Sequence, residues 1–97
     1  MIAFEWDHHK ARANLIKHGV SFPEAATVFD DPYARVIADP DHSQDEERFV
    51  ILGMSIQARE LVVCHCRRGA SESVVRIISA RKATKSEMKQ YWRYFNA

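Results

Sequence analysis

The stretch "LVVCHCRRGASESVVRIISARKATKSE", residues 61–87, decides the fold of this chain. Two runs rich in β-branched residues, 61–68 and 74–80, are separated by the small polar segment "GASES", a pattern typical of strands joined by a short loop. Thr84 and Glu87 then stand at the spacing of a helix capping box. The stretch therefore predicts two strands and a helix start, with arginines on an otherwise apolar strand that require an explanation.

The helices on either side are marked by their ends. Asp7 is expected to cap a helix over residues 8–18, which Gly19 ends. Ser21 and Glu24, again at the capping-box spacing, predict a second short helix directly after it. In the last helix, apolar side chains recur at helical spacing and form one stripe. The stripe consists of Met88, Tyr91, Trp92 and Phe95.

Three more strands are expected, at residues 2–6, 33–38 and 48–55. The order of elements predicts a single α+β domain over residues 1–97. It would have an antiparallel twisted sheet of about four to five strands, two N-terminal helices and one C-terminal helix. We expect the helices to cover one face of the sheet and to leave the other face at least partly open.

Length and composition narrow the class of protein. The 97 residues, 46% of them apolar, suffice for one small core. The sequence has no run of about 18 apolar residues and no signal-peptide pattern, so we expect a cytoplasmic protein without a membrane partner. Cys64 and Cys66, two apart on a predicted strand, are badly placed for a mutual disulfide and fit a reducing compartment.

The net charge of +1 hides an uneven distribution. Residues 1–58 hold five basic and ten acidic side chains, whereas residues 59–97 hold nine basic and three acidic ones. This asymmetry suggests one side that faces a polyanion. The alternative is that the charges mix over the surface once the chain is folded.

Strand alternation divides the side chains of these strands between two faces. We predict that the apolar set, Val62, Cys64 and Cys66 with Val75 and Ile77, forms the core. The opposite set would then form a small cationic patch on the open face. This patch consists of His65, Arg67 and Arg76, with Arg81 and Lys82 at the junction between strand and helix.

Such a patch suits cleavage of RNA by attack of a 2′-hydroxyl on the adjacent phosphate. Arg76 and Arg67 are candidates to stabilise the dianionic phosphorane, because a guanidinium stays charged and binds two phosphate oxygens. His65 or Glu87 could transfer protons. A packed, hydrogen-bonded core residue is the alternative for His65, and a helix cap is the alternative for Glu87.

Other chemistry finds less support. The pairs and triplets "HH" (8–9) and "CHC" (64–66) lack the spacing of zinc sites, so no metal and no other cofactor is expected. The two cysteines are expected to be small core residues. Tyr91 is expected to pack in the core; alternatively it lies at the sheet edge and stacks on an RNA base.

An ordered set of segments resembles a known family. The segments "FEWD", "KHGVSFPEAATVFDDP", "ERFVILGMS", "LVVCHCRRG" and "VRIISARKATKSE" together resemble the BrnT-type toxins of bacterial type II toxin–antitoxin systems. The resemblance implies a RelE-like fold and a metal-independent ribonuclease that arrests translation. It also implies a ribbon-helix-helix antitoxin, BrnA, encoded nearby, and binding of operator DNA only through the antitoxin complex.

The resemblance assigns roles at matching positions. It points to Arg76, to Arg81 and to either Arg67 or Arg68 as functional arginines. RNA would be held by Arg68, Arg81, Lys82 and Tyr91. The competing hypothesis is a non-catalytic module that binds RNA or an acidic partner with the same basic face, and a third hypothesis makes the acidic segment from Asp30 to Glu47 the binding surface.

Overall fold

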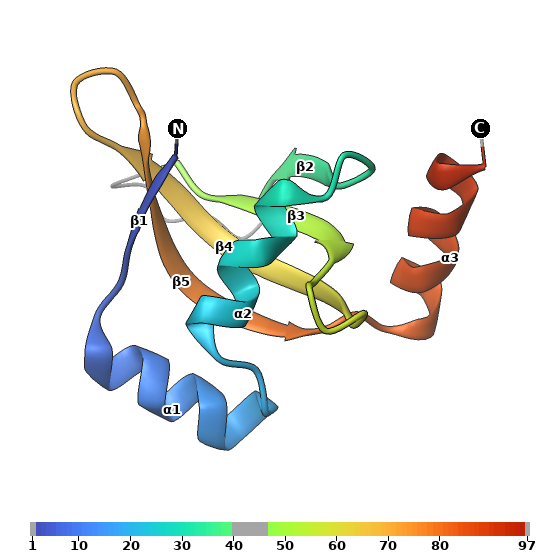
Figure 1. Cartoon of the computed structure of the whole chain (residues 1–97), viewed down its shortest axis with the longest axis horizontal. Coiled ribbons are helices and arrows are strands. Elements are labelled where there is room, and N and C mark those ends of the chain that lie inside the picture. Colours follow the sequence, from blue (N-terminus) through green and yellow to red (C-terminus); the bar gives the residue numbers. More distant parts are fainter. Residues whose placement is uncertain (1, 40–46, 97) are drawn as a thin grey trace.

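The computed structural model describes residues 2–39 and 47–96, and it contains the elements expected from the sequence (Figure 1). The mixed α+β class is confirmed: five strands form one sheet, and three α-helices and one 3-10 helix accompany it. The strands are β1 (Ala3–Glu5), β2 (Arg35–Ala38), β3 (Phe49–Met54), β4 (Glu60–Arg68) and β5 (Val74–Lys82). The helices are α1 (His8–His18), α2 (Phe22–Thr27), η1 (Val28–Asp30) and α3 (Lys85–Phe95).

The predicted helix caps are present, with one exception. Asp7 accepts a hydrogen bond from the amide of Lys10 (3.0 Å) at the start of α1, and Gly19 ends α1 in the left-handed conformation with φ of 70°. Thr84 and Glu87 form the complete capping box of α3. In α2 only half of the expected box forms, because the side chain of Glu24 binds elsewhere.

The Glu24 side chain binds the turn between β3 and β4. Its carboxylate, although buried, accepts hydrogen bonds from Ser55 Oγ (2.7 Å) and from Arg59 Nε (2.9 Å). These bonds hold the pKa of Glu24 below its usual value, with the bond from Arg59 as the largest cause. The network links α2 to the turn between β3 and β4.

The sheet has the order β1-β5-β4-β3-β2. The pairs from β2 to β5 are antiparallel and form the expected meander, whereas β1 pairs with β5 in parallel. The pairing of β4 with β5 shifts between Cys64 and His65, where Cys64 is opposite Ser79 and His65 is opposite Ile77. Ile78 is therefore the extra residue of a β-bulge, which changes the alternation of β5.

The hydrophobic core lies between the sheet and the two N-terminal helices (Figure 1). From the strands it takes Leu61, Val63, Val75 and Ile77, all at most 2% exposed. From the helices and the segment between them it takes Val20, Phe22, Ala25 and Val28. The side of the sheet opposite these residues is here called the open face.

The predicted distribution of β4 side chains between the two faces is wrong. His65 lies in the core, 1% exposed, with its ring edge-on to Phe29 at a centroid distance of 4.8 Å. Val62 and Cys64 instead point to the open face, where they pair with Arg81 and Ser79 of β5. The set Leu61, Val63 and His65 is larger than the set Val62, Cys64 and Cys66, so it fills the space under the helices better.

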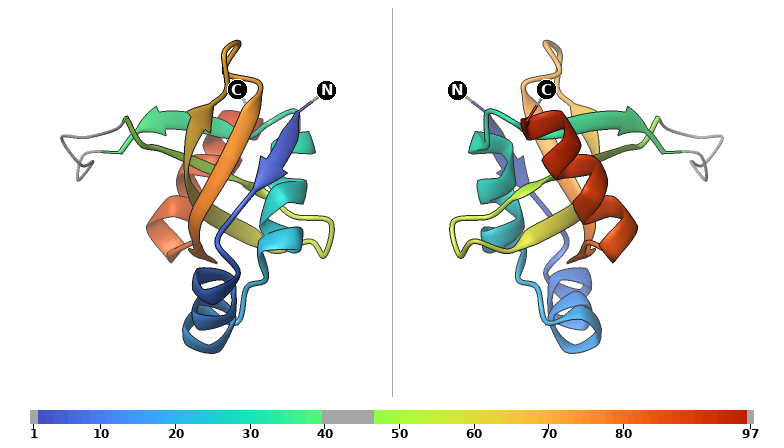
Figure 2. Two further views of the ribbon diagram at one scale, coloured as in Figure 1. Left: turned by 90° about the vertical axis from the view of Figure 1, so that its left-hand side faces the viewer. Right: turned by 90° about the vertical axis from the view of Figure 1, so that its right-hand side faces the viewer.

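Helix α3 does not join the other helices. Figure 2 shows α3 and α2 on opposite sides of the central strands. Tyr91, 2% exposed, attaches α3 through a hydrogen bond from its hydroxyl to Asp31 Oδ2 (2.8 Å). The expectation that all helices cover one face is therefore corrected: α3 flanks the open face. None of the helices in the described part of the chain is long and apolar enough to cross a membrane.

Candidate active site

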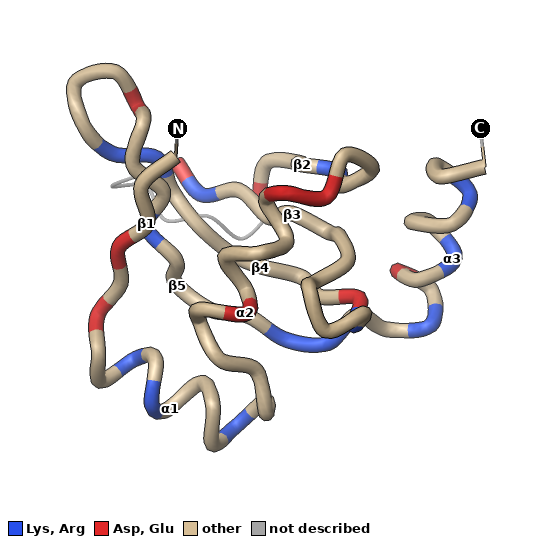
Figure 3. Tube along the Cα trace, in the orientation of Figure 1, with Lys and Arg blue, Asp and Glu red and all other residues tan. Residues whose placement is uncertain are grey.

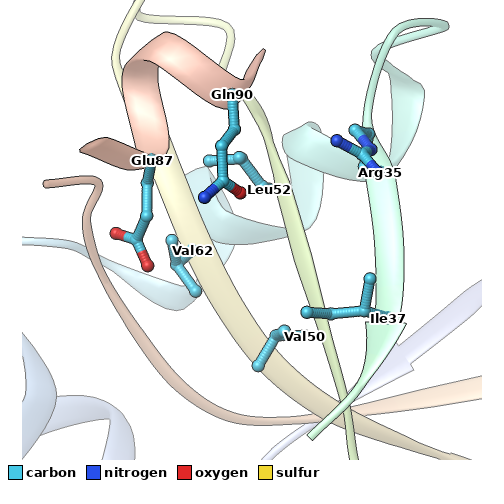
Figure 4. A pocket seen from close by; sticks show the side chains of 7 residues that line it. All are labelled: Arg35, Ile37, Val50, Leu52, Val62, Glu87 and Gln90. Carbon is cyan, nitrogen blue, oxygen red and sulfur yellow. The ribbon is translucent and has the colours of Figure 1, made fainter. Parts of the chain in front are cut away.

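A cleft on the open face combines three adjoining hollows. The first, here called the apolar pocket, has a floor of aliphatic side chains from three neighbouring strands and a wall from α3 (Figure 4). Its floor is made by Ile37, Val50, Leu52 and Val62, and its rim by Arg35, Glu87 and Gln90. The four floor residues are neighbours because Ile37 is opposite Val50, and Leu52 is opposite Val62, in the sheet register.

The second hollow, here called the polar hollow, shares Val50 and Val62 with the apolar pocket. Its other lining residues are Asp39, Arg48, Cys64, Ile78, Ser79 and Arg81. The third hollow, at the outer end of the apolar pocket, is lined by Arg35, Gln90, Arg93 and Tyr94. The cleft thus runs from β5 across the sheet to β2, with arginines at both ends.

Arg81 and Glu87 stand at the boundary between the first two hollows. The Arg81 guanidinium donates to Glu87 Oε1 through Nη1 (2.8 Å) and to Oε2 through Nη2 (2.9 Å). Glu87 Oε1 also accepts the amide of Thr84 (2.8 Å). The bonds from Arg81 are the main reason that the pKa of Glu87 falls to about 2, and they raise the pKa of Arg81.

This geometry fixes the guanidinium at the wall of the cleft. A two-pronged ion pair orients Arg81 more strictly than a single contact would, and the capping box fixes Glu87 in turn. Arg81 keeps further N–H groups that are not used by the carboxylate, since a guanidinium carries five donors. An anion in the cleft can therefore meet a preorganised positive charge.

Arg76 lies toward the same face of the sheet but outside the cleft. It is opposite Cys66 on β4, and its Nη1 donates to Glu5 of β1 (2.9 Å). Arg68 lies 3.9 Å from the same Glu5 carboxylate. The structure therefore brings Arg68 and Arg76 together with Glu5, apart from Arg81, and the expectation of one joint arginine patch is not met.

Arg67 and Lys82 are also absent from the lining of the cleft. Arg67 lies at the end of β4, exposed, and donates to the carbonyl of Glu72 in the β4–β5 loop (3.3 Å). Lys82 is opposite Leu61, which faces the core, and its charge contributes to the lowered pKa of Glu24. Lys82 thus lies toward α2, on the side of the sheet opposite the cleft.

Two predicted site residues are buried. His65 Nδ1 hydrogen-bonds the carbonyl of Val63 (3.2 Å), and burial lowers the pKa of His65. Tyr91 binds Asp31, and burial is the first cause that raises the pKa of its hydroxyl. Neither side chain can touch RNA in this conformation, so we assign both to the structure of the protein. The base-stacking role considered for Tyr91 is withdrawn for the same reason.

The cysteines differ in position. Cys66 is buried, as expected, whereas Cys64 is half-buried and lines the polar hollow. Burial and the contact with Asp39 raise the pKa of the Cys64 thiol to about 11, which keeps it protonated and unreactive. Across residues 2–39 and 47–96, no three His, Cys, Asp or Glu side chains gather in a way that could hold a metal ion.

Basic side chains are not confined to the side of the cleft. Figure 3 shows Lys and Arg on α1 as well as on α3 and at the end of β5. The three basic residues of α1, Lys10, Arg12 and Lys17, lie on the helix that covers the other face. The division of charge along the sequence is therefore only partly a division in space, and the local arrangement around Arg81 carries more information.

Comparison with known proteins identifies the family. The family model described as the ribonuclease toxin BrnT of a type II toxin–antitoxin system matches residues 6–87. The chain belongs to this BrnT family. Among solved structures, the BrnT-family chain is similar to the crystal structure of the Brucella abortus ribonuclease toxin, BrnT. The TM-score is 0.65 at 22% identity, over 88% of this chain and 100% of that one, so this likeness concerns the fold. No curated protein sequence matches.

Several polar residues of the cleft in this BrnT-family chain were not named individually as sequence-based site candidates, among them Arg35, Asp39, Arg48 and Gln90. Two signals were present in the sequence. Arg35 alternates with Ile37 on a short strand, as an open-face position does. Gln90 lies three residues after Glu87, which places both on one side of α3. No local pattern indicated that Asp39, after β2, and Arg48, before β3, would line one hollow together with Arg81 of β5.

Proposed function

We propose that this toxin cleaves RNA in the cleft of the open face, by metal-independent attack of a 2′-hydroxyl on the neighbouring phosphate. The 2′-oxygen loses its proton and forms the new bond to phosphorus, while the bond to the 5′-oxygen breaks and this leaving oxygen takes up a proton from solvent water. The products are a 2′,3′-cyclic phosphate and a 5′-hydroxyl. The observation that carries the proposal is the Arg81–Glu87 pair at the cleft wall, in a chain of a ribonuclease toxin family.

Arg81 stabilises the dianionic phosphorane in this proposal, because its charge is fixed before the substrate arrives. Glu87 acts as a positioning residue for Arg81. A carboxylate with a pKa of about 2 is a weak base, so Glu87 is a poor acceptor for the 2′-proton. Asp39, the other carboxylate among the described lining residues, is the better-placed candidate to accept it.

The test is cleavage of RNA by the purified chain after removal of any antitoxin. With excess EDTA, and both with and without ribosomes, we expect fragments that end in a 2′,3′-cyclic phosphate and begin with a 5′-hydroxyl. Arg81→Gln should reduce the rate by about 10² or more. Lys82→Gln, a neighbouring cation on the other side of the sheet, should stay within about two-fold of wild type.

Two outcomes would contradict the proposal. If the wild-type chain binds RNA but cuts none under either condition, the chain is a degenerate toxin that only binds. If EDTA abolishes cleavage and an added divalent cation restores it, the metal-independent mechanism is wrong. An equal loss of cleavage rate in Arg81→Gln and Lys82→Gln would show that the cleft is not the site of cleavage.

The proposal includes an antitoxin partner and an effect on translation in the cytoplasm. Membership in a type II toxin family supports a protein antitoxin, and we expect a BrnA-like ribbon-helix-helix protein encoded beside this gene. Co-expression of the neighbouring reading frame should yield a stable complex and restore growth and protein synthesis. Operator DNA should bind the complex and not the toxin alone.

A further inference from the structure

The apolar pocket is a second feature of the cleft that catalysis by Arg81 does not explain. Its floor of four aliphatic side chains gives no help to a phosphate, which needs cations and hydrogen-bond donors. Val62 in this floor is 8% exposed, and Ile37 at its outer edge is 55% exposed. The floor is thus an apolar platform that is open from one side, bounded by polar groups from α3 and β2.

Gln90 reaches over this platform. Figure 4 shows its amide group directed from α3 toward the strands, between Glu87 and Leu52. Gln90 is an exposed residue of α3 that lines both this pocket and the third hollow. An amide can donate two hydrogen bonds and accept two at its oxygen, which matches the mixed donor and acceptor edge of a nucleobase.

The position of the pocket relative to Arg81 suits one nucleotide. Glu87 belongs to the pocket lining, and its partner Arg81 lines the adjoining polar hollow. A phosphate at Arg81 is joined to its base through a single ribose, so the base would reach the apolar platform. The flat face of a base would rest on Val50 and Val62, and its edge would meet Gln90.

The outer end of the pocket also carries side chains that could bind a nucleobase. Arg35 and Gln90 also line the third hollow, together with Arg93 and Tyr94. The Arg35 guanidinium lies over the Tyr94 ring, 5.0 Å from its centroid. An exposed aromatic ring with a stacked guanidinium is a common platform for a further base of single-stranded RNA.

We propose that the apolar pocket is a nucleobase subsite next to the scissile phosphate, and that Gln90 selects the base that enters it. This inference rests on the proposed ribonuclease function and adds a source of sequence preference to it. The preference arises because an unmatched base would leave the Gln90 amide and the base edge without hydrogen bonds inside the pocket.

The first test measures binding and does not require cleavage. The chain, labelled at Ile, Leu and Val methyl groups, is titrated with each of the four ribonucleoside 5′-monophosphates and with ribose 5-phosphate as the base-free control. We expect the methyl signals of Leu52 and Val62 to shift with at least one nucleotide and not with ribose 5-phosphate. Ile16, 81% exposed on α1, serves as the methyl that stays unchanged.

The second test uses Gln90→Ala, with Lys89→Ala on the same helix as the matched control. Gln90→Ala should reduce the difference in affinity between the best and worst nucleotide by about three- to ten-fold, whereas Lys89→Ala should preserve it. On a library of random RNA, Gln90→Ala should cleave with weaker base preference than both wild type and Lys89→Ala.

The results separate the two proposals. Base-dependent methyl shifts without any RNA cleavage would retain the subsite and reject the ribonuclease mechanism. Cleavage with an unchanged base preference in Gln90→Ala would reject the subsite alone. The subsite would also be rejected if ribose 5-phosphate shifted the methyl signals as much as the nucleotides do. It would be rejected as well if only the antitoxin protein shifted them, because the pocket would then bind a protein side chain.

Discussion

Tyr91 and Asp31 are 60 residues apart in the chain, and the Tyr91 hydroxyl donates to Asp31 Oδ2 at 2.8 Å. The same oxygen accepts the amide of Met54 (2.8 Å), and Oδ1 accepts the amide of Tyr33 (2.9 Å). Asp31 thus joins the end of β3, the start of the segment before β2, and α3. The wall of the cleft that carries Glu87 and Gln90 depends on this contact for its position.

Tyr91→Phe should lower the free energy of unfolding by about 1.5–3 kcal/mol, because it removes a part-buried hydrogen bond to a carboxylate. Urea unfolding measures the change. Tyr94→Phe is the matched control: it removes a hydroxyl from the same helix, but Tyr94 is 49% exposed and should change stability by less than about 0.5 kcal/mol. Equal effects of the two substitutions would show that Asp31 does not hold α3.

Local signals predicted the elements well, and the reason is physical. Asp7, Gly19, Thr84 and Glu87 act over three or four residues, so α1 and the start of α3 lie where the sequence placed them. The parallel pairing of β1 with β5 and the place of α3 depend on contacts between distant residues. No pattern within one segment contains that information, because it is set by the whole core.

The candidate site was predicted only in part, for the same reason. Arg81 and Glu87 were found because one marks a strand end and the other a helix cap. The distribution of β4 side chains between the faces was wrong because it assumed that the apolar set Val62, Cys64 and Cys66 faces the core, which placed His65 on the open face. A neutral histidine can be a stable core residue when, as in His65, its ring hydrogen-bonds a carbonyl of its own strand and packs against an aromatic ring, here that of Phe29. The β-bulge at Ile78 further changed which β5 residues share a face.

The burial of His65 predicts a specific pH dependence of stability. Its folded pKa is lowered from about 6.5, so the unfolded chain binds the proton first as the pH falls. The stability associated with neutral His65 is present above pH 6.5 and is lost as the pH falls through the lower folded pKa. Between pH 7 and pH 5, the free energy of unfolding should therefore fall further in wild type than in His65→Phe. Urea unfolding of both proteins at the two pH values measures the difference.

Two further measurements sharpen this prediction. Ile16→Ala, an exposed change on α1 that involves no titratable group, should leave the pH profile of wild type unaltered. His65→Phe should also retain RNA cleavage within several-fold, because a side chain that is 1% exposed does not contact the substrate. Parallel pH profiles of wild type and His65→Phe, or a loss of cleavage with intact fold, would make His65 a catalytic candidate again.

The Arg81–Glu87 pair predicts a second pH effect at lower pH. The pKa of Glu87 is about 2, below the usual value of 4.5, so its stabilising contribution is present above about pH 4.5 and is lost as the pH falls through about 2. Glu87→Gln should cost on the order of 1 kcal/mol at pH 7, a figure reduced for the partial exposure of Arg81. The cost should vanish near pH 2.

The control for Glu87→Gln is Glu72→Gln, a change at an exposed residue of the β4–β5 loop, which should show no such pH-dependent difference. RNA cleavage gives an independent readout. Glu87→Gln leaves Arg81 without its carboxylate, so the rate should fall mainly through kcat, and Glu87→Asp should restore part of it. A rise in KM alone with unchanged kcat would argue against the positioning role.

Gly53 provides the last prediction, because it packs against the residues that support Asp31. A Cβ atom at Gly53 would lie 2.8 Å from Val28 Cγ1, 2.9 Å from Ala34 Cβ and 3.2 Å from Asp31 Oδ2. Gly53→Ala should therefore destabilise the chain by about 1–3 kcal/mol through overpacking. Gly19→Ala is the comparison, because a Cβ atom there would have no atom within 4 Å, whereas the φ of +70° strains the backbone of any residue with a side chain. Gly19→Ala should therefore lower the free energy of unfolding by about 1–2 kcal/mol through backbone strain alone.

The two sites around Asp31 should also be coupled. Because Gly53→Ala displaces the carboxylate that accepts the Tyr91 hydroxyl, part of the effect of Tyr91→Phe is already lost in that background. The double variant Gly53→Ala/Tyr91→Phe should therefore be less destabilised than the two single effects together, by about 0.5 kcal/mol or more. Strict additivity in urea unfolding would mean that Asp31 keeps its bond to Tyr91 when Gly53 is replaced, and that the anchor of α3 tolerates crowding at β3.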